Sequence, residues 1–263
     1  MAHEIDYEIH GNEMQFVEIE LDPRETVVAE AGAMLMMDNS IVMETIFGDG
    51  SEKSESGGLW GKLGAAAKRT ITGESLFMTA FTNGGNGKEK VSFSAPYPGK
   101  IIPMDLRNMD GTLICQKDAL LCCAKGISIG IALTKKLGAG FFGGEGFILQ
   151  KLEGDGLAFV HAGGTIIKKT LAPGQILKID TGCLVAMTQN IKYDIQFVGG
   201  FKNAVFGGEG LFFATLTGPG DVWIQSLPFS KLASKVYASA PRGGGKSTDQ
   251  GSILGGLGSL FEK

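Results

Sequence analysis

Short apolar runs separated by glycine-rich turns recur along the chain, and one order of runs is found three times. The copies read DPRETVVAEAGAMLMM (22–37), MDGTLICQKDALLCCA (109–124) and APGQILKIDTGCLVAM (172–187). Each has a turn, a mostly apolar run, a polar break and a second apolar run, which predicts two short β-strands. Gly32, Ala119 and Gly182 take the same place in the three copies. A small residue there predicts a β-bulge or a close approach of the backbone.

A second motif follows each pair of runs and carries a Gly-Glu step. It reads TGESLFMTAF (72–81), GGEGFILQKL (143–152) and GGEGLFFATL (207–216). Its equivalent residues are Gly73 and Glu74, Gly144 and Glu145, and Gly208 and Glu209. A glycine-rich turn and a return strand come next, which predicts a β-hairpin in each copy. In the first return strand Val91, Phe93 and Ala95 alternate with serines, as in a half-buried strand.

These motifs predict an all-β fold in which three units, at about 10–98, 99–164 and 165–228, surround a pseudo-threefold axis. One unit is too small to bury a good core, whereas three stacked units bury one and cover their edge strands. We therefore expect one triplicated domain over 1–239 with a few short helices. Residues 240–263 are expected to form a glycine-rich linker and a short amphipathic tail.

The Gly-Glu motifs, together with GQILKIDTGCLVAM (174–187), resemble the altered-inheritance-of-mitochondria protein twenty-four family over about residues 10–238. This family was long catalogued as a domain of unknown function. The resemblance implies a fold like that of the tryptophan RNA-binding attenuation protein, a short double-stranded β-helix, and assembly into homotrimers. It implies no catalytic residue. The acidic start MAHEIDYEIHG does not look like a mitochondrial import sequence, so that location is not carried over.

Composition narrows the class of protein and of partner. The 263 residues are 43% hydrophobic and carry a net charge of −4, so a global basic footprint for nucleic acid is absent. No apolar run is long enough for a membrane-spanning helix. The cysteines form no C-x-x-C pair and lie in apolar runs: Cys115, Cys122, Cys123 and Cys183. We expect reduced core thiols and, without a secretory signal, a cytoplasmic location.

The stretch APRGGGKST (240–248) meets a loose P-loop pattern, but no βαβ unit surrounds it. We expect a flexible linker that binds no nucleotide. Beyond it, apolar residues share one helical face: Ile253, Leu254, Leu257, Leu260 and Phe261. This tail either folds on docking to its own trimer, a partner groove or a membrane surface, or is an unstructured terminus.

Two groups of charged residues are candidate sites. Under threefold symmetry Glu74, Glu145 and Glu209 converge, and three carboxylates are able to hold a hard cation. The favoured interpretation is that each glutamate caps backbone N–H groups at its glycine turn. Basic residues precede the Gly-Glu motifs: Lys62, Lys68, Arg69, Lys135, Lys136 and Lys202. They form either an ordinary solvated face, which we favour, or a positive ring that contacts RNA, anionic lipid or protein.

We expect a non-enzymatic, homo-oligomeric β-scaffold or binding protein that needs no cofactor. Its first partner is itself, as a homotrimer. The alternative is an RNA-binding protein like the fold relative. A metal-dependent enzyme that uses the glutamates ranks last, because no histidine cluster, nucleophile pair or ligand spacing supports it.

Overall fold

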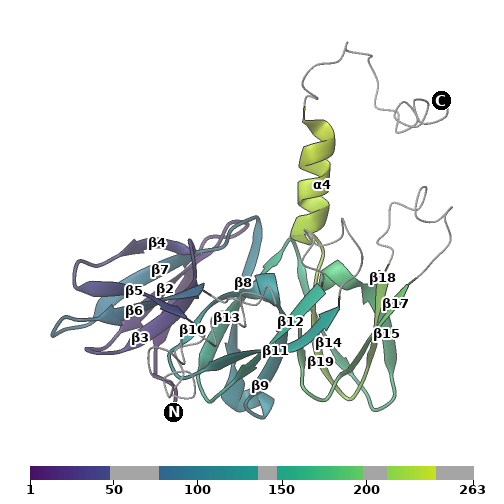
Figure 1. Ribbon diagram of the computed structural model, residues 1–263, viewed down its shortest axis with the longest axis horizontal. Coiled ribbons are helices and arrows are strands. Elements are labelled where there is room, and N and C mark those ends of the chain that lie inside the picture. Colours follow the sequence, from purple (N-terminus) through teal and green to yellow (C-terminus); the bar gives the residue numbers. More distant parts are fainter. Residues whose placement is uncertain (48–76, 136–146, 198–211, 241–263) are drawn as a thin grey trace, which may run out of the picture.

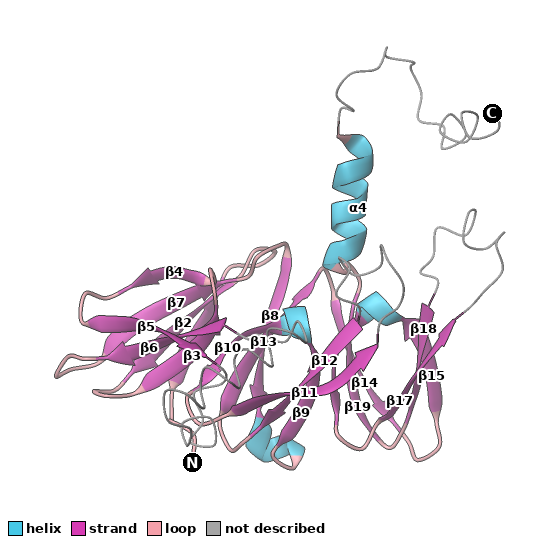
Figure 2. Ribbon diagram, in the orientation of Figure 1, coloured by secondary structure: helices cyan, strands magenta, loops and turns pink. Residues whose placement is uncertain are grey.

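The computed structural model describes residues 1–47, 77–135, 147–197 and 212–240, and it confirms the prediction of a predominantly β chain (Figures 1 and 2). Its strands form four sheets, here named A to D, in which all paired neighbours are antiparallel. Sheet A has the order β1-β2-β7-β4. Its strands are β1 (Asp6–His10), β2 (Phe16–Leu21), β7 (Glu89–Ser94) and β4 (Met34–Met37).

Sheets B and C have six strands each. Sheet B has the order β5-β6-β3-β10-β13-β8. Its strands are β5 (Ile41–Phe47), β6 (Phe77–Asn83), β3 (Thr26–Glu30), β10 (Leu120–Ala124), β13 (Leu157–Gly163) and β8 (Gly99–Asp105). Sheet C has the order β11-β12-β9-β16-β19-β14. Its strands are β11 (Ser128–Lys135), β12 (Phe147–Glu153), β9 (Thr112–Gln116), β16 (Leu184–Thr188), β19 (Gly220–Gln225) and β14 (Ile166–Leu171).

Sheet D has three strands in the order β15-β18-β17. They are β15 (Ile176–Asp180), β18 (Phe212–Thr217) and β17 (Lys192–Phe197). Within the described ranges, 3₁₀ turns lie at Leu106–Met109, Lys117–Ala119 and Thr181–Cys183. Helix α4 (Phe229–Ser239) follows the last strand and projects away from the sheets in Figure 1. In the same view β4 and β15 lie toward opposite ends of the molecule.

The alternation of β2 shows how the sequence sets a buried face. Val17, Ile19 and Leu21 are buried, whereas the intervening Glu18 and Glu20 reach solvent. Since successive side chains of a strand point to opposite faces, this pattern fixes which face of sheet A covers the core. The core that it covers is continuous with that of sheet B.

The glycine-rich turns do not form the predicted hairpins. The strands on either side of each turn belong to different sheets: β6 to B and β7 to A, β12 to C and β13 to B, and β18 to D and β19 to C. Phe81 on β6 instead meets Phe93 on β7 across the core, with ring centroids 5.2 Å apart. The prediction was wrong because a turn between two apolar runs does not specify whether the strands pair or face each other across a core.

Asn83 holds the first of these turns in place. Its buried amide donates to the carbonyl oxygens of Leu21 and Gly87, each at 2.8 Å, and accepts from the N–H of Gly85 at 2.8 Å. One side chain therefore satisfies three backbone groups where the chain crosses from sheet B to sheet A.

The cysteines match the prediction of core thiols. Cys115, Cys122 and Cys123 are buried, Cys183 is half-buried, and none forms a disulfide. Burial raises the pKa of Cys115 and of Cys122, so both remain thiols at neutral pH. Within the described ranges, the chain has no helix with the length and apolar character required to span a membrane.

Candidate interaction surface

Nearly all of the sequence-predicted site residues lie outside the part of the chain that the structure describes. These are Gly73, Glu74, Gly144, Glu145, Gly208, Glu209, Lys62, Lys68, Arg69, Lys136, Lys202, Ile253, Leu254, Leu257, Leu260 and Phe261, with residues 241–248 of the P-loop-like stretch. Lys135 ends β11, and its backbone alone is described. The hypotheses of a cation site, a basic ring and a docking tail therefore stay predictions from sequence.

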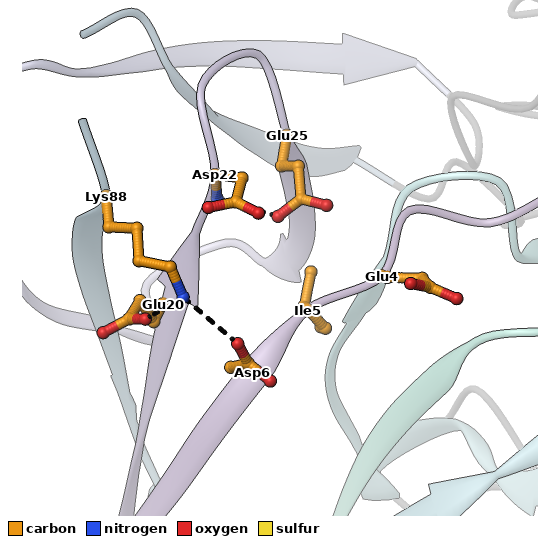
Figure 3. Close-up of a pocket in the computed structure, with 7 residues that line it drawn as sticks. All are labelled: Glu4, Ile5, Asp6, Glu20, Asp22, Glu25 and Lys88. Atoms are coloured by element: carbon orange, nitrogen blue, oxygen red, sulfur yellow. Dashed lines mark hydrogen bonds and ion pairs between the residues drawn. The ribbon is translucent and has the colours of Figure 1, made fainter. Parts of the chain in front are cut away.

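A hollow of about 180 Å³ lies beside β1 and β2 (Figure 3). It is lined by Glu4, Ile5, Asp6, Glu20, Asp22, Glu25 and Lys88. The Nζ of Lys88 lies 2.5 Å from Oε1 of Glu20 and 3.4 Å from Oδ2 of Asp6, and these contacts raise the pKa of Lys88. Glu25 accepts the backbone N–H of Asp22 at 2.8 Å. The carboxylates of Asp6, Glu20 and Glu25 are thus held by partners from this chain. Across the described ranges, no group of three or more His, Cys, Asp or Glu is placed to hold a metal ion.

A second cluster of titratable groups lies around the end of β3, where His161 is buried and Glu30 and Tyr97 are half-buried. Burial, and then the Asp118 carboxylate, raise the pKa of Glu30 to about 7. Burial also lowers the pKa of His161 to about 4 and raises that of Tyr97 to about 12. His161 and Tyr97 are therefore neutral at physiological pH, and Glu30 is partly protonated.

Aromatic packing connects this cluster to helix α4. The Tyr97 ring meets His161 edge-on at 4.8 Å and stacks on Phe229, the first residue of α4, at 5.3 Å. These contacts fix the base of the helix against β13.

Gln225, at the end of β19 in sheet C, hydrogen-bonds to two backbone groups, as Asn83 does to three at the turn from β6 to β7. Its side chain accepts the N–H of Gly163 at 2.8 Å and donates to the carbonyl of Gly182 at 2.9 Å. The side chain is buried, so both backbone groups depend on it for a partner.

The edge of sheet A formed by β4 is apolar and open. Each of its four residues is exposed: Met34 by 38%, Leu35 by 49%, Met36 by 49% and Met37 by 40%. In the described residues β4 pairs with β7 alone, so its other edge presents unpaired backbone groups beside these side chains. Val42 and Met43, on the following strand, are also exposed. An open apolar edge of this kind is a template for pairing with another chain.

The edge of sheet D formed by β15 is the second open strand. Among the described residues β15 pairs with β18 alone. Ile176 is 61% exposed, and Leu177 and Ile179 are half-buried against the core of sheet D. Asp180, at the end of β15, accepts the N–H of Gly182 at 2.9 Å and lies 3.2 Å from the Lys231 Nζ of α4. The helix base is thus tied to the open strand.

Helix α4 presents apolar residues to solvent both at its anchored base and farther along. Phe229 is 55% exposed, Val236 63% and Tyr237 84%. The helix projects from the sheets in Figure 1, so these side chains are accessible to a partner.

Comparison with known proteins agrees with this architecture. A family model described as mitochondrial biogenesis AIM24 matches residues 7–227. The chain belongs to the AIM24 family. An uncharacterized protein of Streptococcus pyogenes serotype M6 is 29% identical over 232 residues, which are 87% of this chain and 88% of that protein. A structural-genomics crystal structure from Streptococcus pyogenes is similar in fold. Its TM-score is 0.69 at 25% identity, over 89% of this chain and 98% of the other.

Sequence reasoning anticipated the AIM24 resemblance, but it missed the surfaces that the structure exposes. The run MLMM of β4 predicts only a strand, and nothing local marks it as an outer edge. Helix α4 carried a usable signal: Pro228 precedes Phe229, Leu232 and Val236, which recur at helical spacing.

Proposed function

We propose that this AIM24-family protein is a non-enzymatic scaffold built from three like β units, which assembles with further copies of itself, as a homotrimer, into a multivalent binding platform. Each unit has six strands: β2 to β7, β8 to β13, and β14 to β19. The fold that we propose for the units is the one the sequence led us to expect, similar to that of the tryptophan RNA-binding attenuation protein.

The order of the strands supports the three units. Sheet B joins β5-β6-β3 to β10-β13-β8, and sheet C joins β11-β12-β9 to β16-β19-β14 in the same sense. Sheet D, taken in the order β17-β18-β15, matches the first half of these sheets. The β2-β7-β4 part of sheet A matches the second half.

Irregular pairings at matching places give further support. The register of pairing shifts between Met34 and Met36 in β4, between Leu120 and Cys122 in β10, and between Leu184 and Ala186 in β16. An extra residue at this position in each unit indicates the same bulge. The predicted bulge site was therefore misplaced.

The position that Gly32, Ala119 and Gly182 share in the three sequence copies has a different role. Gly32 has a φ of +85° and lies two residues before β4, so it serves the turn that leads into the strand. Gly182 lies two residues before β16, and Asp118 two residues before β10. The strand positions therefore align Asp118, rather than Ala119, with the two glycines.

One observation carries the proposal of self-assembly. Inside the chain, strand edges pair in β3–β10 and β9–β16. The equivalent edges of β4 and β15 have no partner among the described residues. A monomer would keep the apolar side chains of β4 in water. An assembly would cover them and display several copies of helix α4, so that weak contacts add in avidity.

Light scattering after size-exclusion chromatography of the full chain tests this function. We expect about 83 kDa, three times the 27.7 kDa of one chain, with an absorbance ratio at 260 and 280 nm typical of protein alone. A monomer would refute the scaffold. A peak rich in 260 nm absorbance that is lost as salt rises would favour the RNA-binding alternative.

A further inference from the structure

We propose that the open edge of β4 in one copy pairs, antiparallel, with the open edge of β15 in a second copy, with Met36 opposite Ile179. The pairing joins sheet A of one molecule to sheet D of the next. It rests on the proposed self-assembly and specifies the contact through which that assembly forms.

Two joints inside the chain provide the template. The first joint pairs β3 with β10 through Ala29 and Cys122, Val28 and Cys123, and Val27 and Ala124. The second pairs β9 with β16 through Cys115 and Ala186, Ile114 and Met187, and Leu113 and Thr188. In both, a five-residue strand meets a strand that contains the bulge.

The register of the two joints is the same. In the first joint the residue after the bulge, Cys122, lies opposite the fourth residue of β3, Ala29. In the second joint the residue after the bulge, Ala186, lies opposite the fourth residue of β9. The residue after the bulge in β4 is Met36, and the fourth residue of β15 is Ile179.

The same rule fixes the neighbouring pairs. Antiparallel strands run in opposite senses, so Met37 comes opposite Lys178, and Asp38, just after β4, opposite Leu177. Side chains of opposed residues share a face of the sheet. Ile179 contacts the core of sheet D, so Met36 would extend that core across the joint.

Burial distinguishes filled joints from open edges. Cys122 and Ala186, at the centre of the internal joints, are 0% exposed, whereas Met36 is 49% exposed. The strands β4 and β15 lie toward opposite ends of the molecule in Figure 1, so one chain does not join its own two edges. The partner is a second copy of this chain. Its β15 is a five-residue strand like β3 and β9, and its β4 has the same bulge as β10 and β16.

The contact is heterologous, because it uses a different surface on each copy. A copy that uses its β4 edge in one contact still has its β15 edge free for another copy, and the reverse also holds. The chains therefore close into a ring or continue as a filament. The proposed homotrimer is a ring in which every such edge is paired.

Cross-linking of two single-cysteine variants tests the pairing. Cys183, the half-buried thiol, is first replaced by serine in every variant. Met36→Cys and Ile179→Cys are then each oxidised alone and after mixing and reassembly. We expect a covalent dimer only in the mixture, and covalent species up to the trimer when both changes are in one chain. The mixture of Met36→Cys with Lys178→Cys is the control, because those side chains lie on opposite faces.

The outcomes separate this inference from the proposed function. An oligomer without the covalent dimer would overturn the pairing and leave self-assembly standing. Cross-linking of Met36→Cys with itself would show a two-fold contact between β4 strands, which also overturns it. A monomeric parent protein would refute the scaffold itself.

Charge substitutions give a second test that does not depend on thiol chemistry. Met37→Lys would bring two lysines together across the joint, whereas Met37→Glu would face Lys178 with an opposite charge. We expect assembly to be about tenfold weaker for the lysine variant than for the glutamate variant. Adding Lys178→Glu to Met37→Lys should restore assembly. Equal assembly of the lysine and glutamate variants would contradict the register.

Discussion

Replacing Glu30 with glutamine is expected to stabilise the protein near pH 8 and to change its stability little near pH 4.5. Glu30 ends β3, where burial and the Asp118 carboxylate raise its pKa from 4.5 to about 7, partly offset by Lys117. Between about pH 4.5 and pH 7, the folded protein therefore holds a proton on Glu30 that the unfolded chain has already released.

The sign follows from proton linkage. Where the folded state binds more protons, stability falls as pH rises. The loss begins near pH 4.5 and is complete above about pH 7, the two pKa values of Glu30. At about 1.4 kcal/mol per pKa unit, the ceiling is about 3 kcal/mol. Because Glu30 is only half-buried, solvent screens part of this effect, and we expect about 1–2 kcal/mol.

Urea unfolding at both pH values measures the effect, at one protein concentration so that assembly does not change between samples. Glu13→Gln is the matched control, because Glu13 is an exposed glutamate. A gain for Glu30→Gln that is equal at both pH values would refute the reasoning. So would a loss of stability near pH 8.

Two further substitutions test single side chains that satisfy several backbone groups. Gln225→Ala removes the hydrogen bonds to Gly163 and Gly182 and should lower the free energy of unfolding by about 2–4 kcal/mol. Replacing the exposed Gln196 with alanine should change it little. Asn83→Ala removes three hydrogen bonds at the turn from β6 to β7 and should cost about 2–3 kcal/mol, against a negligible change for exposed Asn12→Ala. Urea unfolding monitored by circular dichroism measures both, and a loss under about 0.5 kcal/mol in either buried variant would contradict its role.

The strands were predictable because their apolar positions are local and periodic. The runs around Val27, Ile114 and Leu177 all form strands where the sequence indicated them. Their partners were not predictable in the same way, because the choice between pairing and facing depends on contacts far along the chain. Glycine-rich turns that a sequence indicates as hairpins instead carry the chain between sheets.

The candidate surface shows the same limit more sharply. The second apolar runs, MLMM, LLCCA and LVAMT, all resemble buried strands in sequence. The second and third are buried, and the first is exposed. The hydrophobic pattern indicates that a strand is to be buried, but it does not indicate whether the residues that bury it belong to the same chain.

The two ends of a repeat array have to be either capped or joined to something, because each internal unit is covered by its neighbours. Strand β1 has the character of a cap. It covers the edge of β2, and it carries the charged residues Asp6 and Glu8 on its exposed surface. Strand β4 has no such residue: it offers methionine and leucine along an edge that none of the described strands pairs with. Proteins that must stay monomeric place charges or proline on edge strands. The contrast between β1 and β4 within one sheet therefore favours a joint at β4, and methionine suits that joint because its flexible side chain adapts to a partner surface.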